Sequence, residues 1–341
     1  MKKHICLIHA GGTIGMMRKE RGYAPMEGYL GTALEAIADL RAETMPRYSF
    51  VELSPLLDSS DMSVSEWNRI GREIAARYDE YDGFVILHGT DTMAYTASAL
   101  SFMLENLNKP VILTGSQIPL CEVRSDGRDN LITSLLIAAE GVAREVCLFF
   151  GGRLLRGNRA TKVSADGFLA FDSPNCPHLA EVGINVRYLP APLLPKQKEN
   201  APLVLCEFDD VPIGVLKVFP GIQFHLFDTM MTELLRGIVL ETFGAGNSPG
   251  AGAELLPIIR RAFAGGSVVT VCSQCPEGTV TMGAYATSTP LKEAGAVSGF
   301  DMTTEAAVAK LYYLFSRGYD KETIKSKMEE DLRGELTRPA E

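Results

Sequence analysis

Apolar runs of strand length alternate with apolar residues at helical spacing through the first half of the chain. From this alternation we predict strands at residues 5–8, 48–53, 84–87, 110–117 and 146–150. Helices are predicted between them at residues 31–40, 64–78, 93–107 and 131–142. This strand–helix order predicts right-handed crossovers and a mainly parallel, doubly wound sheet.

The second half repeats the alternation on a smaller scale, after a proline-rich stretch at residues 189–202. Its predicted strands are at residues 203–207, 215–218, 238–241 and 268–272, and its predicted helices are at 255–264, at 303–317 and from 320 onward. We therefore expect an α/β protein with a larger N-terminal domain at residues 1–188 and a linker at 189–202. A smaller C-terminal α/β domain is expected at residues 203–341.

The charge balance narrows the class of partner. The 341 residues include 33 basic and 42 acidic side chains, which gives a formal net charge of −9. Nucleic acids and anionic membranes bind basic surfaces, so we expect neither as a partner. No apolar run approaches the ~18 residues of a membrane-spanning helix, and the first one ends at Ile8, too early for a signal peptide. We expect a cytoplasmic protein.

The seven cysteines are odd in number and scattered, which is typical of a reducing compartment. Cys272 and Cys275 have the spacing of a CxxC pair. A zinc site would need a second pair of ligands, and none is apparent. We favour ordinary thiols over a redox role, and we expect no metal and no cofactor.

Two of the predicted strands end in Gly-Thr: Thr13 follows Gly12 after the first, and Thr90 follows Gly89 after the third. Glycine lets the backbone turn sharply and approach a ligand closely. Open α/β sheets bind ligands at the carboxyl ends of their strands. A threonine hydroxyl becomes a nucleophile once a base removes its proton. We interpret the pair as one catalytic site.

Other interpretations of these residues stay open at this point. Glycines after a strand also bind phosphates, but neither GxGxxG nor Gly-Lys-Ser/Thr is present, which disfavours a nucleotide-binding oxidoreductase. Asp91 is equally suited to be a helix N-cap, and residues 58–61 to be an ordinary turn. Lys162 is a solvated lysine unless it is buried near Thr90, where it would be a candidate base.

Two polar segments and two histidines are expected to have structural roles. Residues 16–25 are polar and basic and are expected to form a mobile loop beside Thr13. Residues 153–162 carry four basic side chains, and we expect either a solvated loop or a segment whose charges serve packing or subunit contacts. His9 and His88 each precede a Gly-Thr pair, and we expect both to make structural hydrogen bonds.

Together these motifs resemble those of bacterial type I, cytoplasmic L-asparaginases, over essentially the full length of the chain. The resemblance rests on two signatures, GGTIG at residues 11–15 and HGTDT at residues 88–92. Further motifs in the family's order are DSSDM at 58–62, GSQ at 115–117, RATK at 159–162 and GFDMTTEA at 299–306.

The resemblance implies hydrolysis of L-asparagine to L-aspartate and ammonia through a covalent acyl-threonine, with minor glutaminase activity. It implies that Thr13 is the nucleophile. It also implies that Lys162, beside Asp91, acts as a base through Thr90. Tyr23 would lie on a flexible loop that closes over the substrate.

The resemblance also implies how the substrate is bound. Ser60 would hold its α-carboxylate, and Asp61 and Asp91 would recognise its α-ammonium group. The remaining residues expected to line the substrate site are Gly12, Ser59, Gly89, Thr90 and Ser116.

Family members form homo-oligomers, so a homodimer or a dimer of dimers is expected. Some members carry a second, regulatory asparagine site. Where the family's arginine is expected this chain has Glu241-Thr242, so we do not expect that site to carry over. Two rival hypotheses use the same pocket: the amidase subunit of a tRNA-dependent amidotransferase, and a non-catalytic amino-acid sensor.

Overall fold

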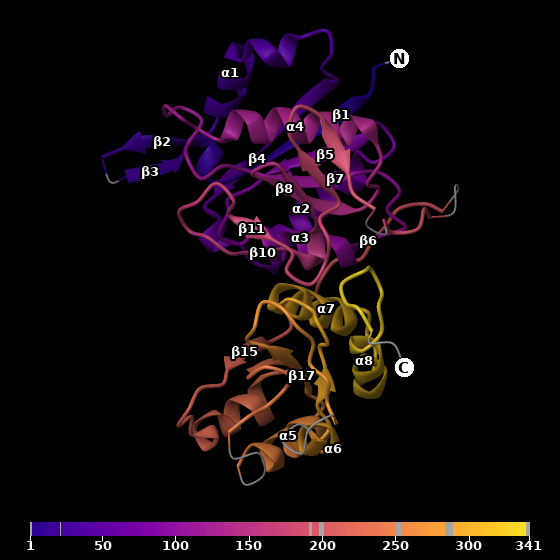
Figure 1. The fold of residues 1–341 in the computed structure, drawn as a ribbon. Helices are drawn as coiled ribbons and strands as arrows, with labels where there is room; N and C mark the ends of the chain where they lie inside the picture. Colours follow the sequence, from indigo (N-terminus) through magenta and orange to yellow (C-terminus); the bar gives the residue numbers. More distant parts are fainter. Residues whose placement is uncertain are drawn as a thin grey trace. The chain divides into compact units, whose positions relative to one another are not determined.

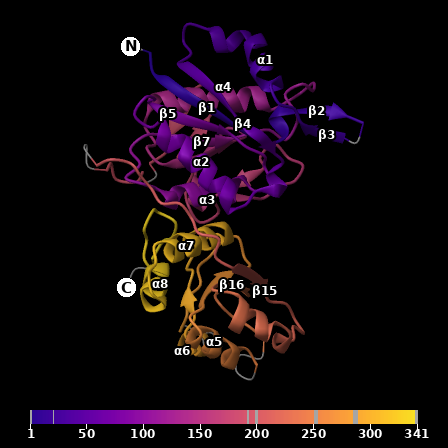
Figure 2. The same ribbon diagram turned by 180° about the vertical axis from the view of Figure 1, so that it is seen from behind.

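The computed structural model describes residues 2–20, 22–190, 193–197, 201–249, 254–283 and 289–338 (Figures 1 and 2). The chain divides into two compact units, Met1–Leu205 and Cys206–Glu341. Each unit has its own buried apolar cluster, as expected for two independent cores.

An eight-stranded sheet forms the centre of the larger unit, with the order β13-β12-β9-β8-β7-β5-β1-β4. Five strands run parallel: β1 (His4–Gly11), β4 (Arg47–Leu57), β5 (Gly83–Leu87), β7 (Val111–Thr114) and β8 (Val146–Phe150). The antiparallel edge consists of β9 (Arg153–Arg156), β12 (Ala180–Val182) and β13 (Val186–Tyr188). The predicted mainly parallel sheet is confirmed.

Helices cover both faces of this sheet, which explains why its central strands are apolar on both sides. On one face lie α1 (Tyr29–Ala36) and α4 (Gly127–Glu140), and on the other lie α2 (Val64–Ala76) and α3 (Met93–Met103) (Figures 1 and 2). Residues from α1 and α4 share a core with alternate positions of β1 and β5. On the opposite face Trp67 of α2 donates its indole N–H to Thr96 of α3, over 3.1 Å.

Two segments differ from what the sequence pattern predicts. The segment expected to form a loop beside Thr13 contains an antiparallel hairpin of β2 (Met16–Lys19) and β3 (Gly22–Pro25). Residues 153–162 are not a solvated loop, because β9 leads into a turn at Gly157–Arg159 and then β10 (Thr161–Lys162), which pairs with β11 (Phe171–Asp172).

The basic segment is buried because its charges have partners. Arg156 is 6% exposed and donates from Nε to Glu145 Oε2 over 2.6 Å. Arg159 is 3% exposed and donates to the Asn175 carbonyl over 2.7 Å. A buried guanidinium is tolerated only when such acceptors are in place.

The strand predicted at residues 203–207 is shorter and lies in the larger unit. It is observed as β14 (Val204–Leu205), which pairs with β6 (Leu104–Glu105) directly after α3.

The smaller unit contains a four-stranded parallel sheet, with the order β15-β16-β17-β18. Its strands are β15 (Ile213–Lys217), β16 (Gly237–Thr242), β17 (Val268–Ser273) and β18 (Val297–Ser298). Its described helices are α5 (Leu255–Ala264), α6 (Thr289–Glu293), α7 (Thr304–Ser316) and α8 (Lys321–Met328). The predicted α/β character of both units is confirmed.

Candidate active site

The carboxyl ends of β1, β4 and β5 are in direct contact. A Cβ added to Gly12, after β1, would lie 2.2 Å from the Gly89 nitrogen, after β5. A Cβ added to Gly89 would lie 2.4 Å from Ser59 Oγ, after β4. Only glycine allows backbones to approach this closely. The two Gly-Thr pairs therefore meet at one edge of the sheet, together with the serine-containing turn.

Thr13 opens a short turn, Thr13–Gly15, at this edge. Its side chain is half-buried, and its hydroxyl has no hydrogen-bond partner among the described residues. The turn rests on the ring of His9, because a Cβ on Gly15 would lie 2.6 Å from His9 Nε2. The Thr13 hydroxyl is thus held on a fixed backbone and is available to a ligand.

Lys162 lies between Thr90 and Asp91, about 70 residues away in the sequence. Its Nζ donates to Thr90 Oγ1 over 2.8 Å and to Asp91 Oδ1 over 2.7 Å. Thr90 is 6% exposed, whereas the Asp91 side chain is 64% exposed. A hydroxyl in contact with an amine can pass a proton to it.

Gln117 also contacts this group, and the sequence reasoning did not single it out. Thr90 Oγ1 donates to Gln117 Oε1 over 3.3 Å. The GSQ motif at residues 115–117 was visible in the sequence, but only its serine was assigned to the site. Ser116 is 1% exposed, and its hydroxyl is buried without a hydrogen-bond partner in the described part of the chain.

The turn at Ser59–Asp61 is held by the side chain that precedes it. Asp58 Oδ1 accepts hydrogen bonds from both the nitrogen and the hydroxyl of Ser60, each over 3.0 Å. The Ser59 carbonyl accepts from Thr92 Oγ1 over 2.7 Å, which ties the turn to the start of α3. Ser59 is buried, while Ser60 and Asp61 are exposed. These last two side chains are accessible to a polar ligand.

Tyr23 is hydrogen-bonded to a residue that the sequence did not assign to the site. It lies on β3 and is 45% exposed, and its hydroxyl donates to Glu122 Oε1 over 2.8 Å. This hydrogen bond to a carboxylate raises the pKa of Tyr23 above its ordinary value. The structure thus brings Lys162, Thr90 and Asp91 into one hydrogen-bonded group, whereas the hydroxyl of Tyr23 is bonded to Glu122.

His88 makes structural hydrogen bonds, as predicted. Its Nδ1 lies 2.7 Å from the Gly89 carbonyl, and its Nε2 lies 2.9 Å from Thr96 Oγ1. A carbonyl only accepts, so Nδ1 carries the hydrogen. Complete burial lowers the pKa of His88 to about 4. His9 is also buried, which lowers its pKa, and its Nδ1 lies 3.3 Å from Glu52 Oε2. The His88 imidazole is therefore neutral at pH 7.

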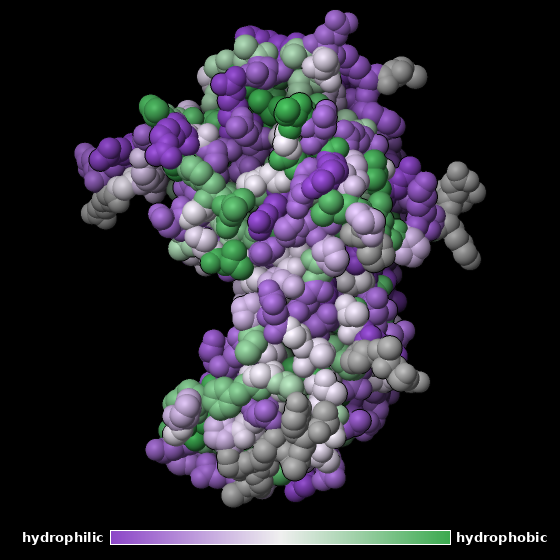
Figure 3. Space-filling view, viewed as in Figure 1, coloured by the Kyte–Doolittle hydropathy of each residue, from purple (hydrophilic) through white to green (hydrophobic). Residues whose placement is uncertain are grey.

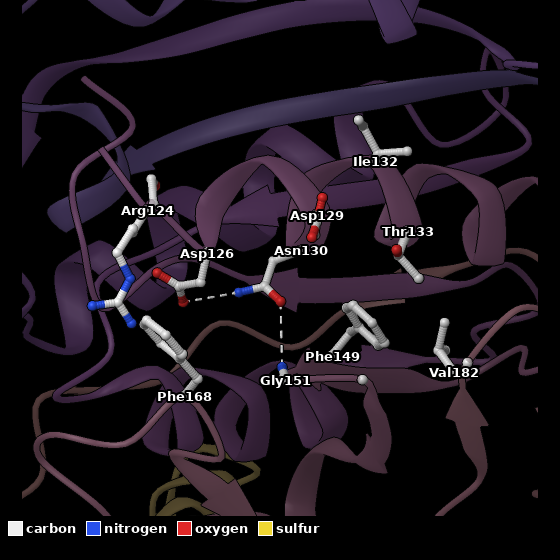
Figure 4. Close-up of a pocket in the computed structure, with 13 residues that line it drawn as sticks. Arg124, Asp126, Asp129, Asn130, Ile132, Thr133, Phe149, Gly151, Phe168 and Val182 are labelled. Carbon is white, nitrogen blue, oxygen red and sulfur yellow. Dashed lines mark hydrogen bonds between the residues drawn. The ribbon is translucent and has the colours of Figure 1, made fainter. Parts of the chain in front are cut away.

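A cavity of about 570 Å³ lies in the larger unit, near the carboxyl ends of its strands (Figure 4). Neither Thr13 nor Thr90 is among its lining residues. Arg124, Asp126 and Phe168 are among its lining residues. Asn130 also lines the cavity. Its Nδ2 donates to Asp126, and its Oδ1 accepts from the Gly151 nitrogen over 3.3 Å. In the described residues no cluster of three or more His, Cys, Asp or Glu side chains is arranged to hold a metal ion.

Comparison with known proteins gives matches over nearly the whole chain. The family model described as "Asparaginase, N-terminal" matches residues 4–193, and that described as "Glutaminase/Asparaginase C-terminal domain" matches residues 212–328. The chain is 49% identical to L-asparaginase 1 of Escherichia coli (strain K12), covering 98% of both chains. It is 42% identical to the 60 kDa lysophospholipase of Mus musculus, covering 99% of this chain but 63% of that protein.

Solved structures agree with these matches. The crystal structure of L-asparaginase I from Vibrio cholerae superposes with a TM-score of 0.91 and 46% identity, covering 99% of this chain and 100% of that one. Both halves of the chain are thus accounted for by one family. The chain belongs to the asparaginase family.

Proposed function

We propose that this enzyme hydrolyses L-asparagine to L-aspartate and ammonia, with Thr13 as the nucleophile. Full-length similarity to proteins named L-asparaginase supports the substrate. The observation that carries the mechanism is the Lys162–Thr90 hydrogen bond of 2.8 Å at the edge where the two Gly-Thr turns pack together.

In the first step Thr13 Oγ1 attacks the side-chain amide carbon of asparagine. A C–O bond forms and the C–N bond breaks, leaving a β-aspartyl ester on Thr13. The hydroxyl proton of Thr13 ends on the departing ammonia. Backbone N–H groups at the strand exits stabilise the oxyanion that develops, and each well-placed donor contributes about 3–4 kcal/mol.

In the second step water attacks the ester and releases L-aspartate. The proton of the water passes to Thr90 Oγ1 as the proton of Thr90 passes to Lys162 Nζ. Lys162 therefore acts as a base through Thr90, and Asp91, 2.7 Å from Nζ, stabilises the ammonium that forms. The C–O bond to Thr13 breaks, and the proton held by Lys162 returns through Thr90 to Thr13 Oγ1, which restores the threonine hydroxyl and the neutral lysine.

A zwitterionic substrate needs a hydrogen-bond donor for its carboxylate and an acceptor for its ammonium group. Ser60 binds the α-carboxylate, and Asp61 and Asp91 bind the α-ammonium group. The remaining surface of the substrate site comes from Gly12, Ser59, Gly89, Thr90 and Ser116. Closure of the β2–β3 hairpin would move Tyr23 from Glu122 toward the substrate and exclude water from the site.

We further propose that the enzyme acts in the cytoplasm as a homodimer or a dimer of dimers. Within the described residues no helix is long and apolar enough to cross a membrane. Several large apolar side chains are exposed on the larger unit, namely Val163, Phe168, Leu169 and Ile184. The face in Figure 3 likewise shows hydrophobic residues among hydrophilic ones. Sedimentation equilibrium tests the proposed oligomeric state. A molecular mass of one chain at micromolar concentration would contradict a dimer or a dimer of dimers.

A coupled ammonia assay that compares L-asparagine with L-glutamine tests the proposed activity. We expect ammonia from asparagine and much less from glutamine at equal concentrations. Binding of aspartate without release of ammonia from either amide would favour the sensor hypothesis and contradict the proposal.

A further inference from the structure

Gln117 is positioned to control the direction of the Thr90 hydroxyl. We propose that it is a positioning residue for the hydrolysis proposed above, on which this inference rests. It would accept the Thr90 hydrogen whenever Lys162 is an ammonium ion. Three observations support this role: the partners of Thr90, the orientation of the Gln117 amide, and the way in which residue 117 is held.

The hydrogen bonds of Thr90 leave one role for Gln117. A lysine ammonium has only donors, so Thr90 Oγ1 accepts the 2.8 Å bond from Lys162. The hydrogen of Thr90 then needs a different acceptor, and Gln117 Oε1 lies 3.3 Å away. Thr90 is 6% exposed, so water has little access to take that place.

The Gln117 amide is oriented by its other end. Its Nε2 donates to the Gly167 carbonyl over 3.1 Å. Since a carbonyl only accepts, the NH₂ group must face Gly167, and the oxygen must face Thr90. Gly167 lies five residues after Lys162, and its own nitrogen donates to Ser164 Oγ over 2.8 Å. One side chain thus connects Thr90 to the loop that follows Lys162.

The backbone of residue 117 is fixed from the opposite side. Asp126 accepts hydrogen bonds from the Gln117 nitrogen, over 3.0 and 3.1 Å to its two oxygens, and from the Ile118 nitrogen over 3.1 Å. Asn130, 4% exposed, donates to Asp126 (Figure 4). It also donates to the Gly115 carbonyl over 3.0 Å. A side chain held on a rigid backbone in this way needs little reorganisation during the reaction.

This role matters most in the second step. As water attacks, Thr90 gives its proton to Lys162 and receives one from the water, and the new ammonium then donates back to Thr90. The hydrogen that Thr90 now holds points to Gln117 Oε1. Without that acceptor, the state in which Lys162 is an ammonium ion would be less stable. The loss of one hydrogen bond of about 1.4 kcal/mol corresponds to a tenfold decrease in rate.

Two variants, Gln117→Met and Gln117→Glu, separate this role from packing. Both lose the donor to Gly167, but glutamate keeps an acceptor for Thr90 and methionine does not. We expect kcat for asparagine to fall about tenfold in Gln117→Met, with KM unchanged, and to be largely restored in Gln117→Glu. Melting temperatures of both variants report the shared packing loss.

The inference is overturned if Gln117→Met turns over asparagine at the wild-type rate. It is also overturned if both variants lose kcat equally, in proportion to their melting temperatures. A wild-type enzyme that releases no ammonia would instead refute the proposed function itself, so the two failures are distinguishable.

Discussion

At the scale of single residues, the proposed proton transfer from Thr90 depends on where Lys162 lies. From the sequence it is one of several basic residues before β11, and only burial near Thr90 would make it a base. The structure places its amine within hydrogen-bonding distance of both Thr90 and Asp91. Its side chain is 20% exposed, which leaves the amine partly shielded from solvent.

Substituting Lys162→Met should reduce kcat for asparagine by about a hundredfold or more, because positioned proton transfer typically contributes 10²–10⁴ in rate. Lys109→Met is a matched control in the same unit, since Lys109 bonds the Tyr78 and Tyr81 carbonyls and has no place in the mechanism. We expect the control to lower the melting temperature and to keep its kcat. Wild-type turnover by Lys162→Met would remove Lys162 from the mechanism.

At the scale of elements, the site is built by three strand ends that pack backbone against backbone. The apolar runs and the glycines predict that β1 and β5 end at one sheet edge. The pattern does not predict the β2–β3 hairpin, because its residues show no clear alternation of polar and apolar side chains. Its pairing depends on backbone hydrogen bonds that side-chain hydropathy does not report.

Substituting Gly12→Ala should disrupt this edge. The new Cβ would lie 2.2 Å from the Gly89 nitrogen, at a backbone φ of +88°. Gly28→Ala is the control, since Gly28 has a φ of +74° but no atom within 4 Å of the added Cβ. We expect about 1–2 kcal/mol of destabilisation for the control, from backbone strain alone, and more than about 3 kcal/mol for Gly12→Ala. Equal losses in urea unfolding would show that the close approach is unimportant.

At the scale of the whole molecule, the strand–helix alternation predicts two α/β units, and both are observed. The alternation does not predict features that depend on partners far apart in the sequence. Arg156 is buried because Glu145 accepts from it, and Gln117 belongs to the site because its amide lies between Thr90 and Gly167. Charge and polarity alone predict solvent exposure at such positions, and only the tertiary structure supplies the partners.

The buried histidines make stability depend on pH. Burial holds the pKa of His88 at about 4, below its ordinary value of 6.5, so the unfolded chain binds this proton more tightly. The contribution of neutral His88 to the free energy of unfolding is complete above pH 6.5 and is lost as the pH falls toward 4. The loss amounts to about 3 kcal/mol. His9, whose pKa is also lowered, acts in the same direction.

Replacing His88→Gln should therefore flatten the dependence of stability on pH. We expect wild type to lose more free energy of unfolding than the variant between pH 7 and pH 5, measured by urea unfolding at one protein concentration. The variant is less stable at pH 7, so the difference between the two pH values is the relevant quantity. Equal losses in both proteins would mean that His88 does not titrate on unfolding in this range.

The central claim is that Thr13 forms a covalent intermediate with the substrate. Rapid acid quenching of the enzyme during turnover of L-asparagine, followed by peptide mass mapping, tests it most directly. We predict a mass increase of one β-aspartyl group on the peptide that contains Thr13. In Thr13→Ala we predict no such peptide and no release of ammonia. An adduct on the peptide that contains Thr90, or wild-type ammonia release by Thr13→Ala, would contradict the account.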